Sequence, residues 1–369
     1  MDPFTNYTNE TDEYSSYDID YPIGFENSFN LRVLIPLALF CFIGILGNLC
    51  FCVAVFLDRS LRKQRSNILL LLMAIGDIVV IITRYLDTLY LESKYIRSWP
   101  WGATMCYLRY AIPVFAQALC IFSLTACSVE RYLGVVKFPM NRTSKMSLFT
   151  VVSVILIIIV STVVAGFSYW WAKYDYEYES CIIKPRNNEL YKWFLVTRFI
   201  VIYIAPLIIV SYCYISIAKR IFHSSSLLTE DDEFQLGVRR SMARRKKGIV
   251  VLLLITLSFA VLWLPYHVHQ LRIEFYIAYR ADIPPHFDFT KDLFHYSSVA
   301  NSVLDPVLIF LLSSEHRKAA WRMLTCKTTC GGWRTQLKKH TPPASSSRHT
   351  ISSSSGKKIN CTNAGTTNL

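Results

Sequence analysis

Seven stretches of this chain are apolar over lengths that can cross a lipid bilayer. A helix needs about 20 mostly apolar residues to span the hydrocarbon core, and hydrophobic residue types make up 53% of the 369 residues. The stretches are Val33–Leu57, Asn67–Leu91, Ala103–Val136, Ser147–Trp171, Lys192–Ile221, Gly248–Ile273 and Leu293–Leu312. They predict an all-α membrane protein, a bundle of seven transmembrane helices.

Charged residues outside these stretches predict the orientation. The segment before Val33 holds seven acidic residues, whereas the segment after Leu312 holds ten Lys and Arg residues and one acid, Glu315. Short basic loops lie on the cytoplasmic side of a membrane, so we expect an extracellular N-terminus, a cytoplasmic C-terminus and a place in the plasma membrane. The net charge of +13 does not indicate nucleic-acid binding, because the basic residues flank the apolar stretches.

Residues 1–30 differ sharply from the bundle in composition. They are polar and acidic and show no helical periodicity, which is typical of a segment that is disordered on its own. Asn6 and Asn9 begin sequons for N-glycosylation, and the predicted orientation puts both of them outside the cell. We therefore expect a glycosylated extracellular tail.

The chain after the seventh stretch divides into two parts. Residues 313–324 alternate apolar and basic positions in a pattern that suits a short amphipathic eighth helix on the membrane surface. Cys326 and Cys330 follow and are candidates for palmitoylation. The folded domain is expected to cover residues 31–326. Residues 327–369, rich in Ser and Thr, are expected to form a disordered cytoplasmic tail that kinases can reach.

Charged side chains within or at the end of the apolar stretches indicate function. Glu130 and Arg131 stand side by side at the end of the third stretch, and such charges are costly near a membrane unless they have partners or a role. Asp77 and Asp305 lie inside the second and seventh stretches. Two carboxylates in one bundle need a proton, a cation or a basic partner. A sodium ion held by Asp77, Asn301 and Asp305 is one interpretation, and a structural hydrogen-bond network is the other.

Cysteines and prolines add two further expectations. Cys106 and Cys181 are the cysteines at extracellular positions, where an oxidising environment favours a disulfide between them. Pro206, Pro265 and Pro306 lie inside the fifth, sixth and seventh stretches. Each removes a backbone hydrogen bond and can kink its helix.

Together these residues resemble the rhodopsin-like G-protein-coupled receptors. Glu130-Arg131-Tyr132 looks like the acidic-Arg-Tyr motif of that family, and Cys106 precedes Arg131 by the family's 25 residues. Further landmarks are Gly47-Asn48, Leu72-Met73-Ala74-Ile75-Gly76-Asp77, Tyr214 eight residues after Pro206, and Phe259, Trp263 and Pro265 in the sixth stretch. Ile121, Pro206 and Phe259 resemble the family's connector triad. One departure is Asp305-Pro306 without the usual tyrosine four residues on.

The resemblance also narrows the ligand. Amine receptors place an aspartate 18 residues before the motif arginine, and this chain has Pro113 there. Trp99-Pro100-Trp101-Gly102 resembles the first extracellular loop of peptide receptors, and the sixth and seventh stretches are similar to the bombesin and endothelin group. The resemblance implies a neuropeptide ligand. The candidate ligand-binding residues are Arg84, Asp87, Gln117, Arg198, His267, Gln270, Lys291 and His295.

The implied mechanism is activation of a heterotrimeric G protein by outward movement of the sixth helix. Arg131 is expected to pair with Glu130 at rest and to contact Tyr214 after release, while Trp263 and Phe259 carry the change from the ligand. Receptor kinases and arrestin are the partners expected at the C-terminal tail, and membrane lipid surrounds the bundle. An orphan or constitutively active receptor, or one for a non-peptide ligand, is the alternative. A transporter is disfavoured because we find no internal repeat. An enzyme is disfavoured because no nucleophile, base and orienting group can be assembled from the sequence.

Overall fold

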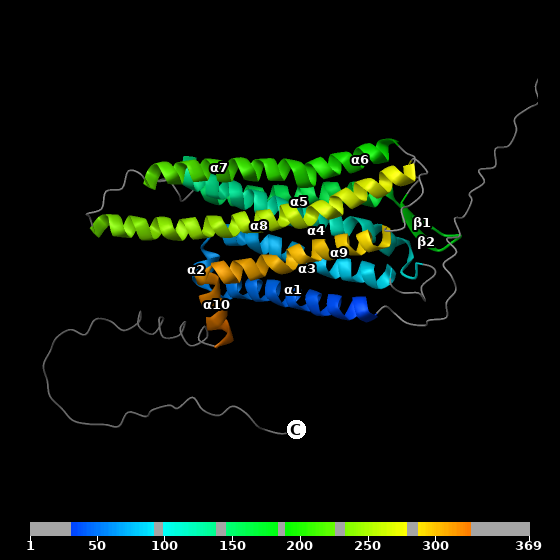
Figure 1. The fold of residues 1–369 in the computed structure, drawn as a ribbon, viewed down its shortest axis with the longest axis horizontal. Helices are drawn as coiled ribbons and strands as arrows, with labels where there is room; N and C mark the ends of the chain where they lie inside the picture. Colours follow the sequence, from blue (N-terminus) through cyan, green and yellow to red (C-terminus); the bar gives the residue numbers. More distant parts are fainter. Residues whose placement is uncertain are drawn as a thin grey trace, which may run out of the picture.

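Seven long helices form one bundle in the computed structural model (Figure 1). The structure describes residues 31–91, 99–137, 145–183, 189–225, 233–278 and 287–325. The bundle consists of α1 (Leu31–Leu57), α3 (Ser66–Leu91), α4 (Gly102–Tyr132), α5 (Lys145–Trp171), α6 and α7 (Glu189–Phe199 and Ala205–Ser225), α8 (Glu233–Ala278) and α9 (Phe287–Leu312). The predicted fold class is confirmed, although α8 begins well before Gly248.

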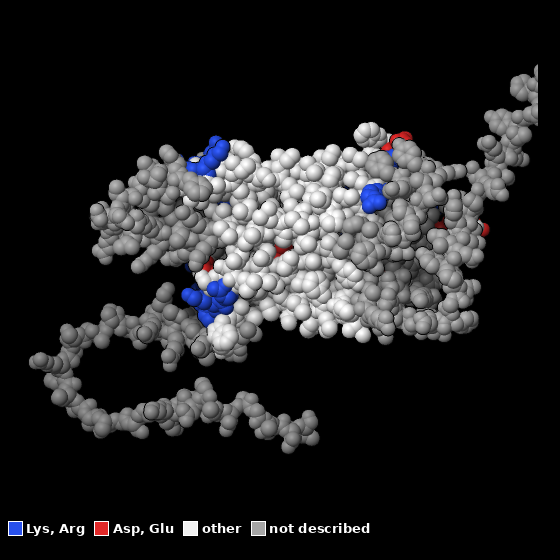
Figure 2. All heavy atoms as spheres, viewed as in Figure 1, with Lys and Arg blue, Asp and Glu red and all other residues white. Residues whose placement is uncertain are grey.

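The apolar surface of the bundle fits hydrocarbon. Six spans among the described residues are long and apolar enough to cross a membrane, and Tyr296–Leu312 qualifies as the seventh when joined to the helix after it. Phe42 of α1 is 63% exposed and Leu148 of α5 is 67% exposed. Figure 2 shows Lys and Arg gathered towards the two ends of the bundle, with other residues covering most of the middle. Such a surface is stable in lipid and a liability in water.

Small residues let the helices approach closely. A Cβ added to Gly44 of α1 would lie 2.6 Å from Val303 of α9 and 2.7 Å from Ile81 of α3. A Cβ on Gly76 of α3 would lie 2.6 Å from the sulfur of Cys120 in α4. Glycine is required at both positions because helix association in membranes depends on close backbone packing.

One end of the bundle carries two short helices, and we call it the α10 end. α2 (Arg59–Arg62) follows α1, and α10 (Ser314–Leu324) follows α9 at an angle of 97° (Figure 1). The α10 helix buries Ala319 against the bundle and leaves Trp321 67% exposed. The predicted amphipathic eighth helix is therefore present. The palmitoylation candidates Cys326 and Cys330 lie outside the described residues, as do Asn6 and Asn9.

The opposite end carries a hairpin, and we call it the hairpin end. Strands β1 (Ala172–Asp175) and β2 (Ser180–Ile183) pair antiparallel with Tyr174 opposite Cys181. A disulfide joins Cys181 to Cys106 in α4, with a Cα–Cα distance of 5.4 Å. This is the disulfide that the sequence predicts, and it ties the hairpin to the first turns of α4. The sequence analysis did not anticipate the hairpin itself.

A helix irregularity is present at one of the three prolines that were predicted to disturb their helices, Pro206. The π-helical turn η2 (Ile200–Ile204) separates α6 from α7, immediately before Ala205 and Pro206. Because Pro206 has no N–H, the backbone before it loses a hydrogen bond and shifts to the wider turn. Pro265 and Pro306 lie within α8 and α9, which continue through them. A second π-helical turn, η1 (Leu133–Lys137), extends α4.

Candidate functional site

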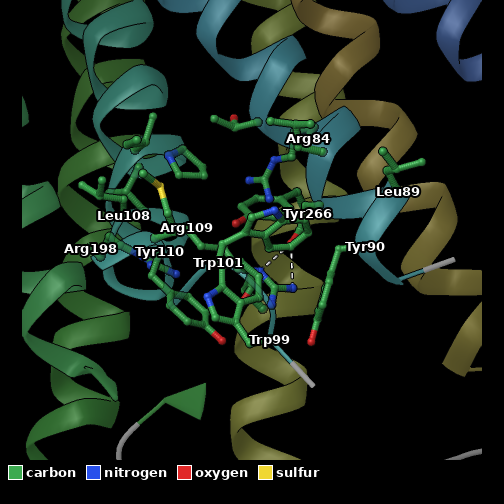
Figure 3. Close-up of a pocket in the computed structure, with 18 of the residues that line it drawn as sticks. Arg84, Leu89, Tyr90, Trp99, Trp101, Leu108, Arg109, Tyr110, Arg198 and Tyr266 are labelled. Carbon is green, nitrogen blue, oxygen red and sulfur yellow. Dashed lines mark hydrogen bonds and ion pairs between the residues drawn. The ribbon is translucent and has the colours of Figure 1, made fainter. Parts of the chain in front are cut away.

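A cavity of about 490 Å³ lies within the bundle near the hairpin end. Its lining comes from α3, α4, α6 and α8 and from the residues that precede α4. Figure 3 shows the labelled side chains converging from these helices. Cavities of this size with apolar walls and a few polar groups are typical of ligand sites. Of the residues predicted to contact ligand, Arg84, Asp87, Arg198 and Gln270 line the cavity.

An aromatic cluster forms one wall of the cavity. Trp99 contacts Tyr90 at 5.1 Å and Trp101 at 4.7 Å between ring centres. The indole Nε1 of Trp99 donates to the carbonyl of Gly102, and its backbone N–H donates to Glu179 of the hairpin turn. Gly102 has a positive φ of 69°, which glycine adopts without strain. The Trp-Pro-Trp-Gly segment therefore builds the wall between α3 and the hairpin.

Asp87 is an ion-pair partner within this wall. Its carboxylate accepts hydrogen bonds from Arg109 of α4, at 2.7 Å from Nη2 and 2.8 Å from Nε. The Arg109 guanidinium also lies 4.7 Å from the ring centre of Tyr90 and 5.1 Å from that of Trp99. Sequence reasoning missed Arg109. The signal was its place near the start of the third stretch, at the same depth as Asp87.

Arg84 and Tyr266 meet deeper in the cavity. Arg84 of α3 is 7% exposed, and its guanidinium carbon lies 4.3 Å from the ring centre of Tyr266 in α8 (Figure 3). The Nε of Arg84 is buried without a hydrogen-bond partner. Tyr266 was not among the predicted site residues. Its signal was the position between Pro265 and His267, which faces both the cavity and the core.

Two predicted contact residues support the floor of the cavity from below. Gln117 of α4 and His267 of α8 are hydrogen-bonded at 2.9 Å between Nε2 atoms, and both are buried. The His267 ring packs against Phe199 and Tyr203. The remaining two candidates, Lys291 and His295, belong to a part of α9 whose side chains lie outside the described residues.

An aromatic column leads from the cavity into the core. Tyr266 contacts Trp263 edge to face at 5.5 Å, and Trp263 contacts Phe259 at 5.8 Å. Trp263 and Phe259 are 1% and 2% exposed, and Ile121 of α4 is fully buried in the same core. Interiors packed this tightly switch between discrete arrangements. A change at Tyr266 therefore has a direct packing route to Phe259.

The mid-bundle carboxylates lie together. Asp77 and Asp305 are both buried, and each contacts the other's carboxylate. Cys120 donates to Asp77 at 3.4 Å, and Asn301 donates to Asp305 at 3.4 Å. One oxygen of each carboxylate is buried without a partner, as are Asn301 Oδ1 and Ser302 Oγ. Two carboxylates in contact cannot both remain charged without a proton or a cation.

The Glu-Arg-Tyr motif differs from our expectation. Glu130 accepts a hydrogen bond from Ser66 of α3 at 2.6 Å. The expected ion pair between Glu130 and Arg131 is wrong for this structure, because Arg131 forms none of the ion pairs of the described residues and its Nε is buried without a partner. The partner of Glu130 is thus a hydroxyl of the adjacent helix α3. Tyr132 packs on Tyr212 of α7 at 5.8 Å.

Tyr214 lies beside this motif. Ser128 of α4 donates to the Tyr214 hydroxyl at 3.2 Å, so the phenol of α7 points into the bundle. Arg131 acts electrostatically on the same phenol. Tyr214 and Arg131 therefore share this end of the bundle, and a direct contact between them stays a prediction.

A polar network joins α10 to the rest of the α10 end. Arg322 pairs with Asp58 at 2.6 Å, and Asp58 also caps α2 by accepting from Ser60 and Leu61. His316 is hydrogen-bonded to Ser313 at 2.6 Å and to Asn67 at 3.3 Å. Burial lowers the pKa of His316 to about 4, with Arg131 acting in the same direction and Glu315 and Asp58 opposing. His316 is therefore neutral at physiological pH.

A seven-helix bundle with a cavity at one end, an aromatic column in its core and a half-buried arginine at the other end has the architecture of a membrane receptor. The sequence profile described as "7 transmembrane receptor (rhodopsin family)" matches residues 47–308. The chain belongs to this family, and it is therefore a receptor rather than an enzyme.

Individual relatives agree with the family. The neuropeptide CCHamide-1 receptor of Drosophila melanogaster is 30% identical over 314 residues, which cover 81% of this chain and 61% of that receptor. The [Phe13]-bombesin receptor of Bombina orientalis is 26% identical, covering 78% of this chain and 74% of its own length. The somatostatin receptor type 2 of Sus scrofa is 27% identical, covering 77% and 74%.

Proposed function

We propose that this protein is a plasma-membrane receptor that binds an extracellular peptide at the hairpin end and activates a heterotrimeric G protein at the α10 end. The observation that carries the proposal is Tyr266, which lines the cavity and contacts Trp263. The names of the relatives, receptors for CCHamide-1, bombesin and somatostatin, support a peptide as the ligand.

The proposed mechanism is a population shift between two packings of the bundle. A peptide that contacts Tyr266 and Gln270 favours one arrangement of Tyr266, Trp263 and Phe259 over the other. Movement of α8 at Pro265 then opens the α10 end so that Arg131 can receive the G protein. The peptide must bind the two arrangements with different affinity, because equal affinity shifts nothing.

A sodium ion between Asp77, Asn301 and Asp305 belongs to the same proposal. The unpartnered oxygens of these residues and of Ser302 offer an oxygen-rich, negatively charged site. A sodium ion there would offset one of the two negative charges and favour the resting packing. Sodium that lowers peptide affinity in wild type and not in Asp77→Asn would support this role, and sodium without effect on wild type would refute it.

Further parts of the proposal concern the ends of the chain. Glycosylation at Asn6 and Asn9, palmitoylation at Cys326 and Cys330, and recognition of the Ser- and Thr-rich tail by receptor kinases and arrestin would follow from an extracellular N-terminus and a cytoplasmic C-terminus. The +13 charge and its distribution support that orientation.

The experiment that tests the proposal is a calcium and cyclic-AMP assay on cells that express the full chain. A panel of neuropeptides, including CCHamide-1, bombesin, galanin and somatostatin, is applied to wild type and to Tyr266→Ala. We expect at least one peptide to give a response that Tyr266→Ala weakens strongly at equal surface expression. Silence to every peptide, together with high basal activity, would contradict the proposal and favour a constitutive receptor.

A further inference from the structure

Positive charge exceeds negative charge in the lining of the cavity. Among its described lining residues, the arginines are Arg84, Arg109 and Arg198, and the single carboxylate is Asp87. Asp87 is already engaged by Arg109. Neither Arg84 nor Arg198 has a carboxylate within ion-pair distance in the part of the chain that the structure describes. Among the described residues, the cavity therefore retains two guanidinium groups that no carboxylate neutralises.

Arg84 is the more demanding of the two. Only 7% of its surface is exposed, and its Nε has no hydrogen-bond partner. The ring of Tyr266 at 4.3 Å gives a cation–π contact, and the Tyr266 hydroxyl also accepts a hydrogen bond from the guanidinium, but neither contact satisfies Nε. A buried charge inside a membrane bundle is costly and typically serves a function. An anion entering the cavity would supply the missing acceptor.

Arg198 approaches the same region from another helix. It is half-buried on α6, with its guanidinium carbon 5.6 Å from the ring centre of Phe194. Arg84 and Arg198 both act electrostatically on Tyr266 and on His267 of α8. The two arginines, from α3 and α6, thus act on the same segment of α8, and the aromatic column begins in that segment.

We propose that Arg84 and Arg198 form a clamp for a carboxylate, so that the cavity selects a peptide that presents one. This inference rests on the proposed function and names the chemistry of its ligand. A guanidinium fork matches the two oxygens of a carboxylate and binds them in a bidentate manner. The carboxylate belongs to the C-terminus of the peptide or to an Asp or Glu side chain, and both sources present the same group.

The charge of the hairpin favours a peptide that enters the cavity with its carboxylate first. The hairpin carries Asp175, Glu177 and Glu179 against one base, Lys173. Glu177, Glu179 and Lys173 are exposed, and Asp175 is half-buried. The hairpin borders the cavity, because Trp99 donates to the carbonyl of Glu179. A negative rim above a positive floor repels a carboxylate at the rim and attracts it within the cavity. The clamp therefore favours a peptide with its carboxylate inside and any basic residues towards the hairpin.

Direct binding to the purified full chain tests the clamp without a known agonist. The probes are N-acetylphenylalanine and N-acetylphenylalanine amide, because the phenyl ring suits the aromatic wall and only the first carries a carboxylate. We expect the acid to raise the Tm at a millimolar concentration at which the amide gives no increase. Arg84→Gln and Arg198→Gln should each abolish the difference. Lys192→Gln, which removes a charge on α6 outside the cavity, should retain it. Equal shifts for acid and amide, or no shift with either, would overturn the clamp.

A cell assay identifies the source of the carboxylate. Each neuropeptide of the panel that activates the receptor is remade with the opposite C-terminus, free acid or amide, and with each Asp or Glu changed to Asn or Gln. Removing the clamped carboxylate should lower the potency of the peptide at least about 30-fold, and Arg84→Gln should lower the potency of the unmodified peptide by a similar factor. The modified peptide should lose no further potency on the Arg84→Gln receptor, because the interaction is already absent.

The outcomes separate the two proposals. A peptide whose potency withstands the removal of every carboxylate overturns the clamp and leaves the peptide receptor standing. Silence to the whole panel counts against the peptide receptor, whereas the acid and amide probes still decide the clamp. Surface expression of the Arg84 variants is measured in parallel, and Arg198→Gln, at a half-buried position, gives the same test if Arg84→Gln does not reach the surface.

Discussion

The two ends of the bundle treat their charged side chains differently. At the α10 end Asp58 is bound to Arg322 and to the first turn of α2, and Glu130 is bound to Ser66. At the hairpin end Asp87 is the single carboxylate among the described lining of a cavity that also holds three arginines. Among the described residues, the α10 end satisfies its carboxylates within the chain, whereas the cavity at the hairpin end holds two arginines without a carboxylate partner.

Each end nevertheless leaves one arginine incompletely bonded. The Nε atoms of Arg84 and Arg131 are both buried without a partner. Arg84 faces a cavity, and the column of Tyr266, Trp263 and Phe259 begins beside it. Arg131 acts electrostatically on Tyr214 at the other end. In the proposed function, Arg84 beside the cavity contacts the ligand and Arg131 at the α10 end couples to the G protein.

The largest effect is expected from Arg131→Ala. The substitution should leave peptide affinity near the wild-type value, because Arg131 lies far from the cavity lining, and should reduce the G-protein response roughly 100-fold or more. Radioligand or fluorescent-peptide binding and a calcium or cyclic-AMP assay on the same cells measure both properties. Lys318→Ala removes an exposed charge on α10 and serves as the control. A variant that signals normally would remove the functional distinction between the two ends.

Acid should loosen the α10 end more than the hairpin end. The folded-state pKa of His316, about 4, lies below its ordinary value of 6.5, so the unfolded chain takes up the proton first. The contribution of His316 to the free energy of unfolding is fully present above pH 6.5 and is lost as the pH drops towards 4. At pH 5 the loss is about 2 kcal/mol. Thermal unfolding of the purified chain in detergent between pH 7 and pH 5 measures the loss.

A matched variant isolates this contribution. His316→Asn keeps a side chain that can bond Ser313 and Asn67 but does not titrate in this range. It should therefore lose stability less steeply with acid than wild type. An identical pH dependence in the two proteins would show that other groups dominate, and it would leave the α10 network without a titrating member.

Local patterns in the sequence were enough to predict the bundle. A stretch such as Ser147–Trp171 must form a helix in lipid, because every backbone polar group has to be hydrogen-bonded within the segment. The pairing of Cys106 with Cys181 followed from the positions of the two cysteines outside the membrane. The amphipathic α10 was also visible as a pattern of apolar and basic positions.

Partner choice between helices was not predictable in the same way. Arg109 and Asp87 are 22 residues apart on different helices, and Ser66 and Glu130 are 64 apart. Each pairing depends on how far one helix is rotated about its axis relative to its neighbour, a quantity that a single sequence does not encode locally. Gln117 and His267 were predicted to contact ligand, yet they bond each other and do not line the cavity, because of the same rotations.

A smaller effect is expected from Asp87→Asn, which sharpens the charge comparison. Asparagine still accepts a hydrogen bond from Arg109, so the aromatic wall should keep its shape while the cavity gains one net positive charge. The Kd of N-acetylphenylalanine should fall roughly fivefold, corresponding to about 1 kcal/mol across a partly screened distance. Titration of the Tm shift against probe concentration measures it. Weaker binding of the acid would mean that Asp87 serves the ligand through its own charge.

The smallest effect is expected where the α10 end is most exposed. Arg322 is 51% exposed while Asp58 is 7% exposed, so solvent screens their ion pair, and Arg322→Gln should cost about 0.5 kcal/mol of stability. Asp58→Asn should cost about the same, because asparagine still caps the first turn of α2. A double-mutant cycle by thermal unfolding should then give a coupling of about 0.5 kcal/mol. If Asp58→Asn alone cost more than about 2 kcal/mol, the carboxylate would be a buried charge that depends on its partner. The α10 end would then rely on a desolvated ion pair. Both ends would hold a buried charge that needs a partner, and they would differ only in whether that partner belongs to the chain or to the ligand.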